Sequence, residues 1–120
     1  MNQRRFPGSV YTVGSEPDPR FTLANERTFL AWIRTSLAFV AGAVALRAFD
    51  LDLPEGLTHV VSTIMLVGAL ILPVVAWFHW AASERAMREE RPLPGSYTLP
   101  VLVGFVLLIA AVLLYGELAV

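Results

Sequence analysis

Cysteine and lysine are both absent from this chain of 120 residues. Without cysteine there are no disulfides and no thiolate metal sites, and all nine basic residues are arginine. Charged residues are also scarce, at 16% of the sequence, whereas soluble domains carry about a quarter. The net charge of −1 argues against a general nucleic-acid binder. Because 56% of the residues are hydrophobic, the composition predicts a protein that folds in lipid.

Three long apolar runs cover roughly residues 29–49, 57–80 and 99–115. Each approaches the ~20 residues that cross a ~30 Å hydrocarbon layer. A soluble bundle would need polar outer faces, which the stretch VLVGFVLLIAAVLL lacks. We therefore predict an all-α membrane protein with three transmembrane helices per subunit. The predicted parts are a flexible tail at 1–18 and a transmembrane domain at 19–120, with helix one at about 19–49, helix two at about 57–91 and helix three at about 97–118.

The loops between these runs predict the orientation of the chain. The first loop, at 50–56, is acidic and contains no arginine, whereas the second, at 83–95, contains three. Cytoplasmic segments collect basic residues, so we expect a multi-pass inner-membrane protein with its N-terminus in the cytoplasm and its C-terminus outside. Pairs four residues apart, Glu84 with Arg88 and Arg85 with Glu89, favour a polar extension of helix two into the cytoplasm.

Arg20, Arg27 and Arg34 are spaced by seven residues and share one stripe if the first helix begins at Pro19, with Asp18 as its cap. An arginine at membrane depth costs at least ~2.5–3.5 kcal/mol unless it snorkels, pairs or faces water. The stripe therefore has two interpretations. Either Arg34 lies close enough to Trp32 and the interface to reach lipid phosphates, or the arginines face a wet path inside an assembly.

Small residues four apart in the same helix, Ala38 with Gly42 and Ala41 with Ala45, predict close helix packing in lipid. A helix that packs closely and carries arginines fits the inside of an assembly better than its rim. One subunit is too small to enclose a charged path, so we predict a homo-oligomeric ring with helix one innermost. Rings of arginine or lysine select anions and phosphates in pores.

The sequence offers little for an enzyme. We find no nucleophile–base pair, phosphate loop or metal motif, and we predict neither enzymatic activity nor a cofactor. His59 and His79 would lie ~30 Å apart at opposite ends of one helix. A metal site formed by His59 with Asp50, Asp52 and Glu55 is a minor alternative.

The stretch RFTLANERTFLAWIRT, at 20–35, resembles the YidH family of small bacterial inner-membrane proteins, which is labelled as a domain of unknown function. The shorter LANERTFLAW also resembles the membrane domain of the eukaryotic vacuolar transporter chaperone complex, which makes and translocates polyphosphate. This second resemblance implies a ring of five subunits around a basic channel, with Arg20 and Arg27 in the pore lining and Glu26 as a pairing or gating partner. The vacuolar subunits carry an uncharged polar residue in place of Arg34, and this chain has no domain that could make polyphosphate.

Together these observations predict an anion-binding site or channel, with Arg27 and Arg34 as its electrostatic filter and Arg20 at its entrance. Glu26 would neutralise part of the field, and Asn25 would hydrogen-bond between neighbouring subunits. The alternative is a structural or partner-binding membrane protein whose arginines anchor lipid phosphates or dock an unidentified subunit. A third possibility is a component of a larger transporter. The expected partners are the lipid bilayer, further copies of the chain and anions, and not nucleic acid.

Overall fold

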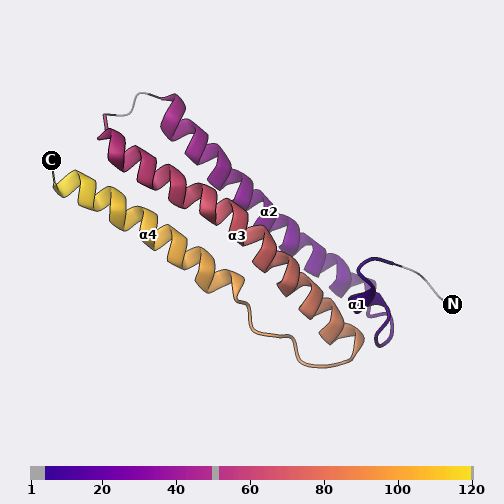
Figure 1. Cartoon of the computed structure of the whole chain (residues 1–120). Coiled ribbons are helices and arrows are strands. Elements are labelled where there is room, and N and C mark those ends of the chain that lie inside the picture. Colours follow the sequence, from indigo (N-terminus) through magenta and orange to yellow (C-terminus); the bar gives the residue numbers. More distant parts are fainter. Residues whose placement is uncertain (1–4, 50–51, 120) are drawn as a thin grey trace.

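The computed structural model describes residues 5–49 and 52–119. The described part contains the short helix α1 (Gly8–Tyr11) and three long helices, α2 (Pro19–Ala48), α3 (Glu55–Arg88) and α4 (Thr98–Leu118). The long helices lie side by side in an elongated antiparallel bundle of 64 × 24 × 21 Å, with α3 packed against both α2 and α4 (Figure 1). We call the end of the bundle where α1 lies the tail end, and the opposite end the far end.

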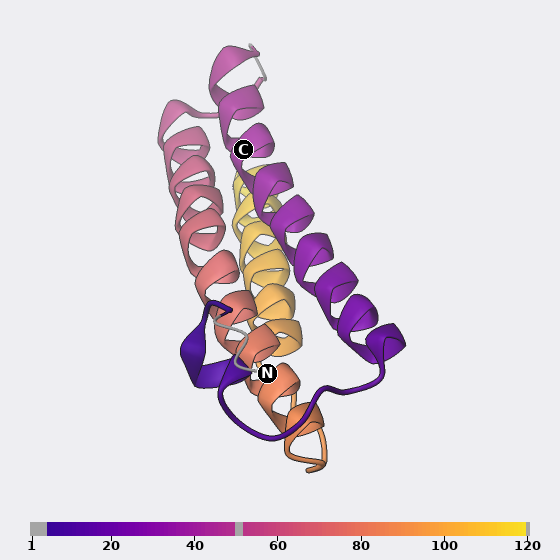
Figure 2. The same cartoon turned by 90° about the vertical axis from the view of Figure 1, so that its right-hand side faces the viewer.

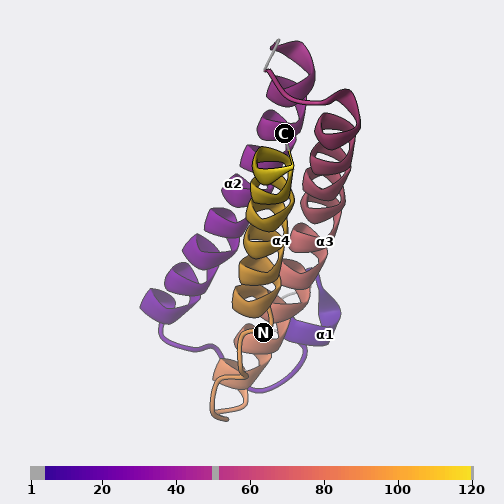
Figure 3. The ribbon, with the colours of Figure 1, turned by 90° about the vertical axis from the view of Figure 1, so that its left-hand side faces the viewer.

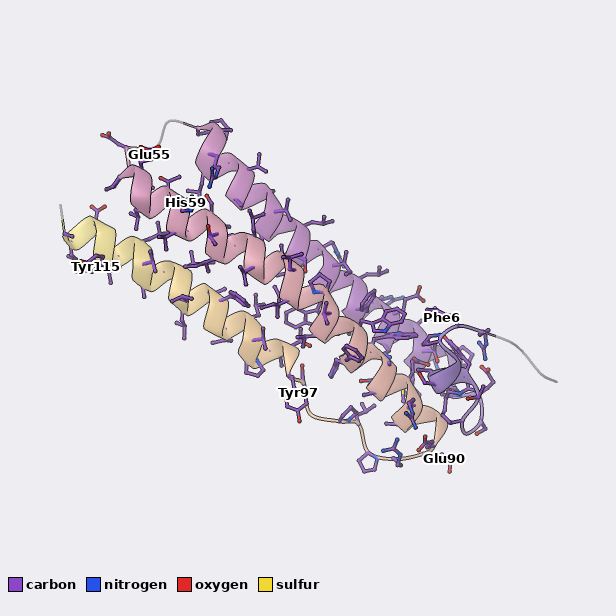
Figure 4. The ribbon with its side chains drawn as sticks, in the orientation of Figure 1. Phe6, Glu55, His59, Glu90, Tyr97 and Tyr115 are labelled. Atoms are coloured by element: carbon purple, nitrogen blue, oxygen red, sulfur yellow. The ribbon has the colours of Figure 1, made fainter. Side chains whose placement is uncertain are left out.

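The three long helices are each long and apolar enough to cross a membrane, which confirms the predicted all-α fold with three candidate spans. The α4 helix makes the case most clearly, because only 6% of its most apolar stretch is buried within the subunit. A helix that is apolar on every side is stable only when lipid or protein surrounds it. Its 21 residues rise ~31 Å, close to the ~30 Å of a hydrocarbon layer. Tyr97 and Tyr115 lie exposed at its two ends (Figure 4), where membrane interfaces favour tyrosine.

The contact between α2 and α3 uses one face of α2, which we call the inner seam. Phe39 lies at its centre, beside Gly68 of α3, and its ring meets that of Phe105 from α4 edge to face, with the ring centroids 6.1 Å apart. Gly42 is equally close to α3, because a Cβ there would overlap the end of Met65. The inner seam alternates steps of three and four residues, as in a coiled coil; its members are all buried or half-buried, and they are Thr22, Asn25, Phe29, Trp32, Ser36, Phe39, Ala43 and Leu46.

The α3 helix ends at Arg88, three residues before the end expected from sequence. Glu90 follows in the left-handed conformation with φ of +54°, and two backbone bonds close the end of the helix. They run from Arg91 N–H to Ala86 O, at 2.8 Å, and from Glu90 N–H to Met87 O, at 3.3 Å. This is the Schellman arrangement, which stops a helix because the next residue turns away. Of the two pairs expected to extend this helix, Arg85 with Glu89 is present at 3.6 Å.

The expected pair of Glu84 with Arg88 is wrong, because both side chains have partners elsewhere in the subunit. The mobility predicted for the tail at 1–18 stays a prediction, and its residues 1–4 lie outside the described part. Its described part passes from the end of α3 to the start of α2 (Figure 2), and α1 packs on α3 at the tail end (Figure 3). Arg88 of α3 bonds to this segment.

Candidate functional site

The first turn of α2 holds Arg20 beside its cap. Pro19 occupies the first helical position, and the Asp18 carboxylate accepts a hydrogen bond from the Arg20 backbone N–H at 2.9 Å. The same carboxylate pairs with the Arg20 guanidinium at 2.9 Å. The bond from the Arg20 side chain, followed by the one from its backbone, holds the pKa of the Asp18 carboxyl below its ordinary value. Arg20 is therefore partly neutralised within its own subunit.

Arg20, Arg27 and Arg34 belong to one exposed stripe along α2, which we call the outer seam. Its two central apolar residues, Leu37 and Val44, are 62% and 60% exposed. The outer seam again alternates steps of three and four, and all its members are exposed; they are Arg20, Leu23, Arg27, Leu30, Arg34, Leu37, Ala41, Val44 and Ala48. It is displaced from the inner seam by two positions, or ~200° around the helix, so it lies on the face opposite α3. No described part of the subunit covers it.

The charges of the outer seam are concentrated toward the tail end. Within residues 5–49 and 52–119, Arg27 and Arg34 form no ion pair and donate no side-chain hydrogen bond. From Leu37 to Ala48 the seam contains only leucine, alanine and valine. The stripe therefore consists of a basic half and an apolar half.

The register of the helices gives the depth of each arginine. Asn25 lies opposite Trp80, and Phe39 and Phe105 both lie beside Gly68, which fixes α2 and α4 against α3. On this register three interfacial aromatics, Trp32, Trp77 and Tyr97, lie within about one helical turn of the same level (Figure 4 labels Tyr97).

Such a level of tryptophan and tyrosine marks one edge of the hydrocarbon layer. Measured along α2 from Trp32, Arg34 lies two residues, or ~3 Å, deeper and Arg27 lies ~7 Å farther out. Arg20 and Arg27 therefore lie at the membrane surface at the tail end, and Arg34 lies just inside the hydrocarbon layer. The apolar half lies in the hydrocarbon layer.

Asn25 belongs to a buried polar cluster between α2 and α3. Its amide donates to Trp80 O at 3.1 Å and to Glu84 Oε1 at 3.2 Å. Thr22 Oγ1 lies 3.4 Å from Glu84 Oε2, and Glu84 is only 1% exposed. Both N–H groups of Asn25 are thus used inside the subunit, which differs from the contact between subunits expected from sequence. The role of Glu84 was missed, because its partners lie about sixty residues away along the chain.

Arg88 holds the N-terminal tail against the end of α3. Its side chain, 7% exposed, donates to Val13 O at 2.8 Å, to Tyr11 O at 3.1 Å and to Glu16 Oε1 at 3.2 Å. Ser15 N–H in turn donates to the Arg88 carbonyl at 2.9 Å. A buried arginine with three oxygen partners makes charge-assisted bonds, so this clamp fixes the position of α1. No local pattern in the sequence signals it.

Glu26 faces a pocket of about 260 Å³ at the tail end, between α1, α2 and α3. In the part of the chain that the structure describes, its carboxylate pairs with no arginine. The pairing or gating role implied by resemblance stays a prediction. The pocket is lined by Tyr11, Thr22, Glu26, Phe29, Leu30, Trp77 and Trp80.

The small residues predicted to pack between helices are divided between two faces of α2. Gly42 is in close contact with α3 and Ala45 is half-buried, whereas Ala38 and Ala41 are exposed. The subunit therefore uses Gly42, and in part Ala45, for its own packing and leaves Ala38 and Ala41 open, with Ala41 in the outer seam.

The far end contains the two remaining polar groups of interest. Arg47 Nη2 lies 2.9 Å from His59 Nδ1, a contact that needs the imidazole nitrogen as acceptor. In the described ranges no group of three or more histidine, aspartate or glutamate side chains is placed to hold a metal ion. Asp50, part of the minor metal alternative, lies outside those ranges.

Three apolar spans and interfacial aromatics at their ends define a multi-pass membrane protein. The model of a family described as a domain of unknown function, DUF202, matches residues 20–86, and the chain belongs to this family. It is 37% identical over 111 residues to the inner membrane protein YidH of Escherichia coli (strain K12), covering 89% of this chain and 93% of that protein.

A second relative is the uncharacterized protein Rv2272 of Mycobacterium tuberculosis (strain ATCC 25618 / H37Rv), with 46% identity over 81 residues that cover 66% of each chain. No solved structure matches the chain. The homology to YidH, together with the three apolar helices, places this protein in the inner membrane.

Proposed function

We propose that this protein forms a homo-oligomeric ring in the inner membrane, in which the outer seams of several α2 helices line an anion-binding path. The observation that carries this proposal is the outer seam itself: a coiled-coil spacing of exposed residues on a helix face that no other described part of the subunit covers. A second copy of the same helix is the partner that this spacing fits. Further copies around an axis would bring their arginines into rings.

The positive charge of the arginines indicates that the ligand of this path is an anion. Stacked rings of Arg27 and Arg34 repel one another unless anions neutralise them, and basic rings are the selective element of anion and phosphate pores. Arg20, paired with Asp18, would lie at the entrance. The resemblance of LANERTFLAW to the membrane domain of the polyphosphate-translocating complex supports a ring of five and suggests phosphate or polyphosphate as the anion. We expect no catalysis by this subunit.

The distribution of arginines favours a tail end in the cytoplasm. Arg47 lies at the far end and Arg34 midway along α2, and the other described arginines lie toward the tail end. By the positive-inside rule, the N-terminus is cytoplasmic and the C-terminus lies outside.

The apolar half of the outer seam implies a gate in such a pore. In the ring, Leu37, Ala41 and Val44 would surround the path through the hydrocarbon layer, and apolar constrictions close pores by dewetting. The basic half then acts as a mouth that concentrates anions at the cytoplasmic surface. Conduction would need a change that widens or wets the apolar half.

Anion flux into liposomes tests this function, with wild type compared with the Arg27→Leu/Arg34→Leu double variant. We expect flux or saturable anion binding in the wild type and its loss in the double variant, while the oligomer stays intact. Arg91→Leu is the matched control, because Arg91 is exposed and lies outside α2. A Leu37→Ser variant opens the path in case the wild type is closed. Unchanged anion binding and flux in the double variant would contradict the proposal.

One observation favours a second candidate function. Arg34 lies only ~3 Å inside the aromatic level, a depth from which its side chain reaches lipid phosphates. The outer seam would then dock a partner subunit or anchor lipids, with no path for ions. A discrete hetero-complex in native-membrane crosslinking, with no homo-oligomer, would favour this alternative.

A further inference from the structure

The pocket at the tail end combines aromatic rings with a carboxylate. Trp77 and Trp80 have ring centroids 5.2 Å apart, and Phe29 lies 6.1 Å from the first and 6.5 Å from the second. Tyr11 contributes a fourth ring from α1, and Glu26 the carboxylate. Aromatic faces attract cations, and clusters of rings recognise substituted ammonium groups. The volume of about 260 Å³ is below the ~300–1,000 Å³ of pockets for drug-sized ligands, so any ligand is small.

Two carboxylates lie near this pocket, and within the described residues neither has a basic side chain as a partner. Glu26 lines it directly and is exposed, so the cost of burial applies to Glu84 alone. Glu84 lies behind Thr22, is 1% exposed, and is bonded by the neutral donors Thr22 and Asn25. Across residues 5–49 and 52–119, no arginine pairs with either glutamate. A buried carboxylate is costly unless a positive charge compensates it, and a cation in the pocket would supply that charge.

The arginines close to the pocket are already engaged. The guanidinium carbons of Arg5 and Arg88 lie 4.2 Å and 5.4 Å from the centre of the Tyr11 ring, and both guanidinium groups pair with Glu16. Arg88 also fixes Tyr11 through the backbone bonds of the clamp. Arg5 and Arg88 therefore hold the Tyr11 ring in place at the side of the pocket. An interfacial aromatic belt explains the tryptophans alone, but it does not account for the Glu26 carboxylate in the lining of the pocket or for the buried Glu84 carboxylate behind it.

We propose that this pocket binds a small organic cation of the alkylammonium class, with its ammonium group between the aromatic rings and Glu26. The same chemistry is found in the headgroup of an ammonium-bearing lipid and in a free solute. The position of the pocket at the aromatic level of the membrane makes it accessible to both. This site lies between helices of one subunit, so it does not depend on the proposed ring.

The test uses the purified full-length protein in nanodiscs of phosphatidylglycerol, a lipid that has no ammonium group. Choline and ethanolamine are titrated while tryptophan fluorescence and binding heat are recorded, and 3,3-dimethylbutan-1-ol is the uncharged counterpart of choline. We expect saturable binding of the cations and no saturable signal from the alcohol. Glu26→Gln should weaken the affinity about tenfold or more, the effect of losing one charge-assisted contact. Glu117→Gln, an exposed glutamate near the end of α4, should bind as wild type does.

Trp77→Leu is a second variant. If the Trp77→Leu protein fails to fold, the Glu26→Gln protein still tests the proposal. Equal binding of the alcohol, or an unchanged affinity after Glu26→Gln, would overturn the proposal. Nanodiscs that contain phosphatidylethanolamine distinguish the two sources of the ligand. A lower apparent affinity for choline there identifies the lipid headgroup as the occupant, and an unchanged affinity identifies a free solute.

Discussion

At the scale of a single residue, the backbone conformation of Glu90 ends α3. Glu90 has φ of +54° in a position where glycine is the usual residue, because a side chain there costs roughly 1–2 kcal/mol. We predict that Glu90→Gly stabilises the protein by about 1 kcal/mol, measured by thermal unfolding in detergent. Glu90→Ala is the matched control: it also removes the charge but keeps a Cβ. Equal effects of the two substitutions would show that charge, and not backbone conformation, determines stability at this position.

Single residues also show where sequence reasoning succeeded and where it failed. The spacing of Arg20, Arg27 and Arg34 placed them correctly on one face of a helix, since helical geometry alone fixes that relation. The pairing of Glu84 with Arg88 was wrong for the opposite reason. Each has partners far away in the chain, at Asn25 and Val13, and no local pattern reveals contacts of that range. The role predicted for Glu26 stays a prediction, and its place in an aromatic pocket depends on three different helices.

At the scale of the helix, Gly68 lies where α3 closely approaches side chains of both α2 and α4. A Cβ on Gly68 would lie 2.6 Å from the Phe39 ring of α2 and 3.3 Å from the Phe105 ring of α4. We predict that Gly68→Ala destabilises the bundle by ~1–3 kcal/mol, the usual cost of overpacking, in unfolding by SDS titration.

Gly104→Ala is the control for this helix-scale prediction, because a Cβ there meets nothing within 4 Å. Alanine is the better helix former by about 1 kcal/mol, so this variant should be as stable as wild type or more so. If Gly68→Ala were equally harmless, the packing of the two phenylalanine rings around α3 would be looser than described.

Hydropathy predicted the three long helices, since lipid leaves few alternatives for a long apolar segment. The sequence was a poorer guide to which face of α2 packs against α3 and which stays exposed. Arginine spacing indicated one seam, but the inner seam mixes threonine, asparagine, aromatics and alanine, a pattern with no simple hydrophobic signature. The tail helix α1 has four residues, too few for a periodic pattern, so composition gave no sign of it.

At the scale of the whole molecule, orientation can be tested cleanly because the chain has no cysteine. Single substitutions Ser9→Cys, in α1 of the tail, and Asp52→Cys, in the far loop, introduce one exposed thiol each. We predict that a membrane-impermeant maleimide labels Asp52→Cys in intact cells whose outer membrane is permeable to it. Ser9→Cys should be labelled only after the inner membrane is opened. The reverse pattern would invert the proposed orientation, and labelling of both in intact cells would contradict a single topology.

The clamp formed by Arg88 has a consequence for the order in which the protein is made. Val13 and Arg88 are separated by 75 positions in the chain, so the tail emerges from the ribosome long before its anchor exists. It docks only when α2 and α3 have both been inserted and their ends at the tail side have met. The clamp therefore closes only after α2 and α3 have formed a helical hairpin. A bulky fusion placed close before residue 5 would compete with this last step, whereas a fusion after α4 would leave it undisturbed.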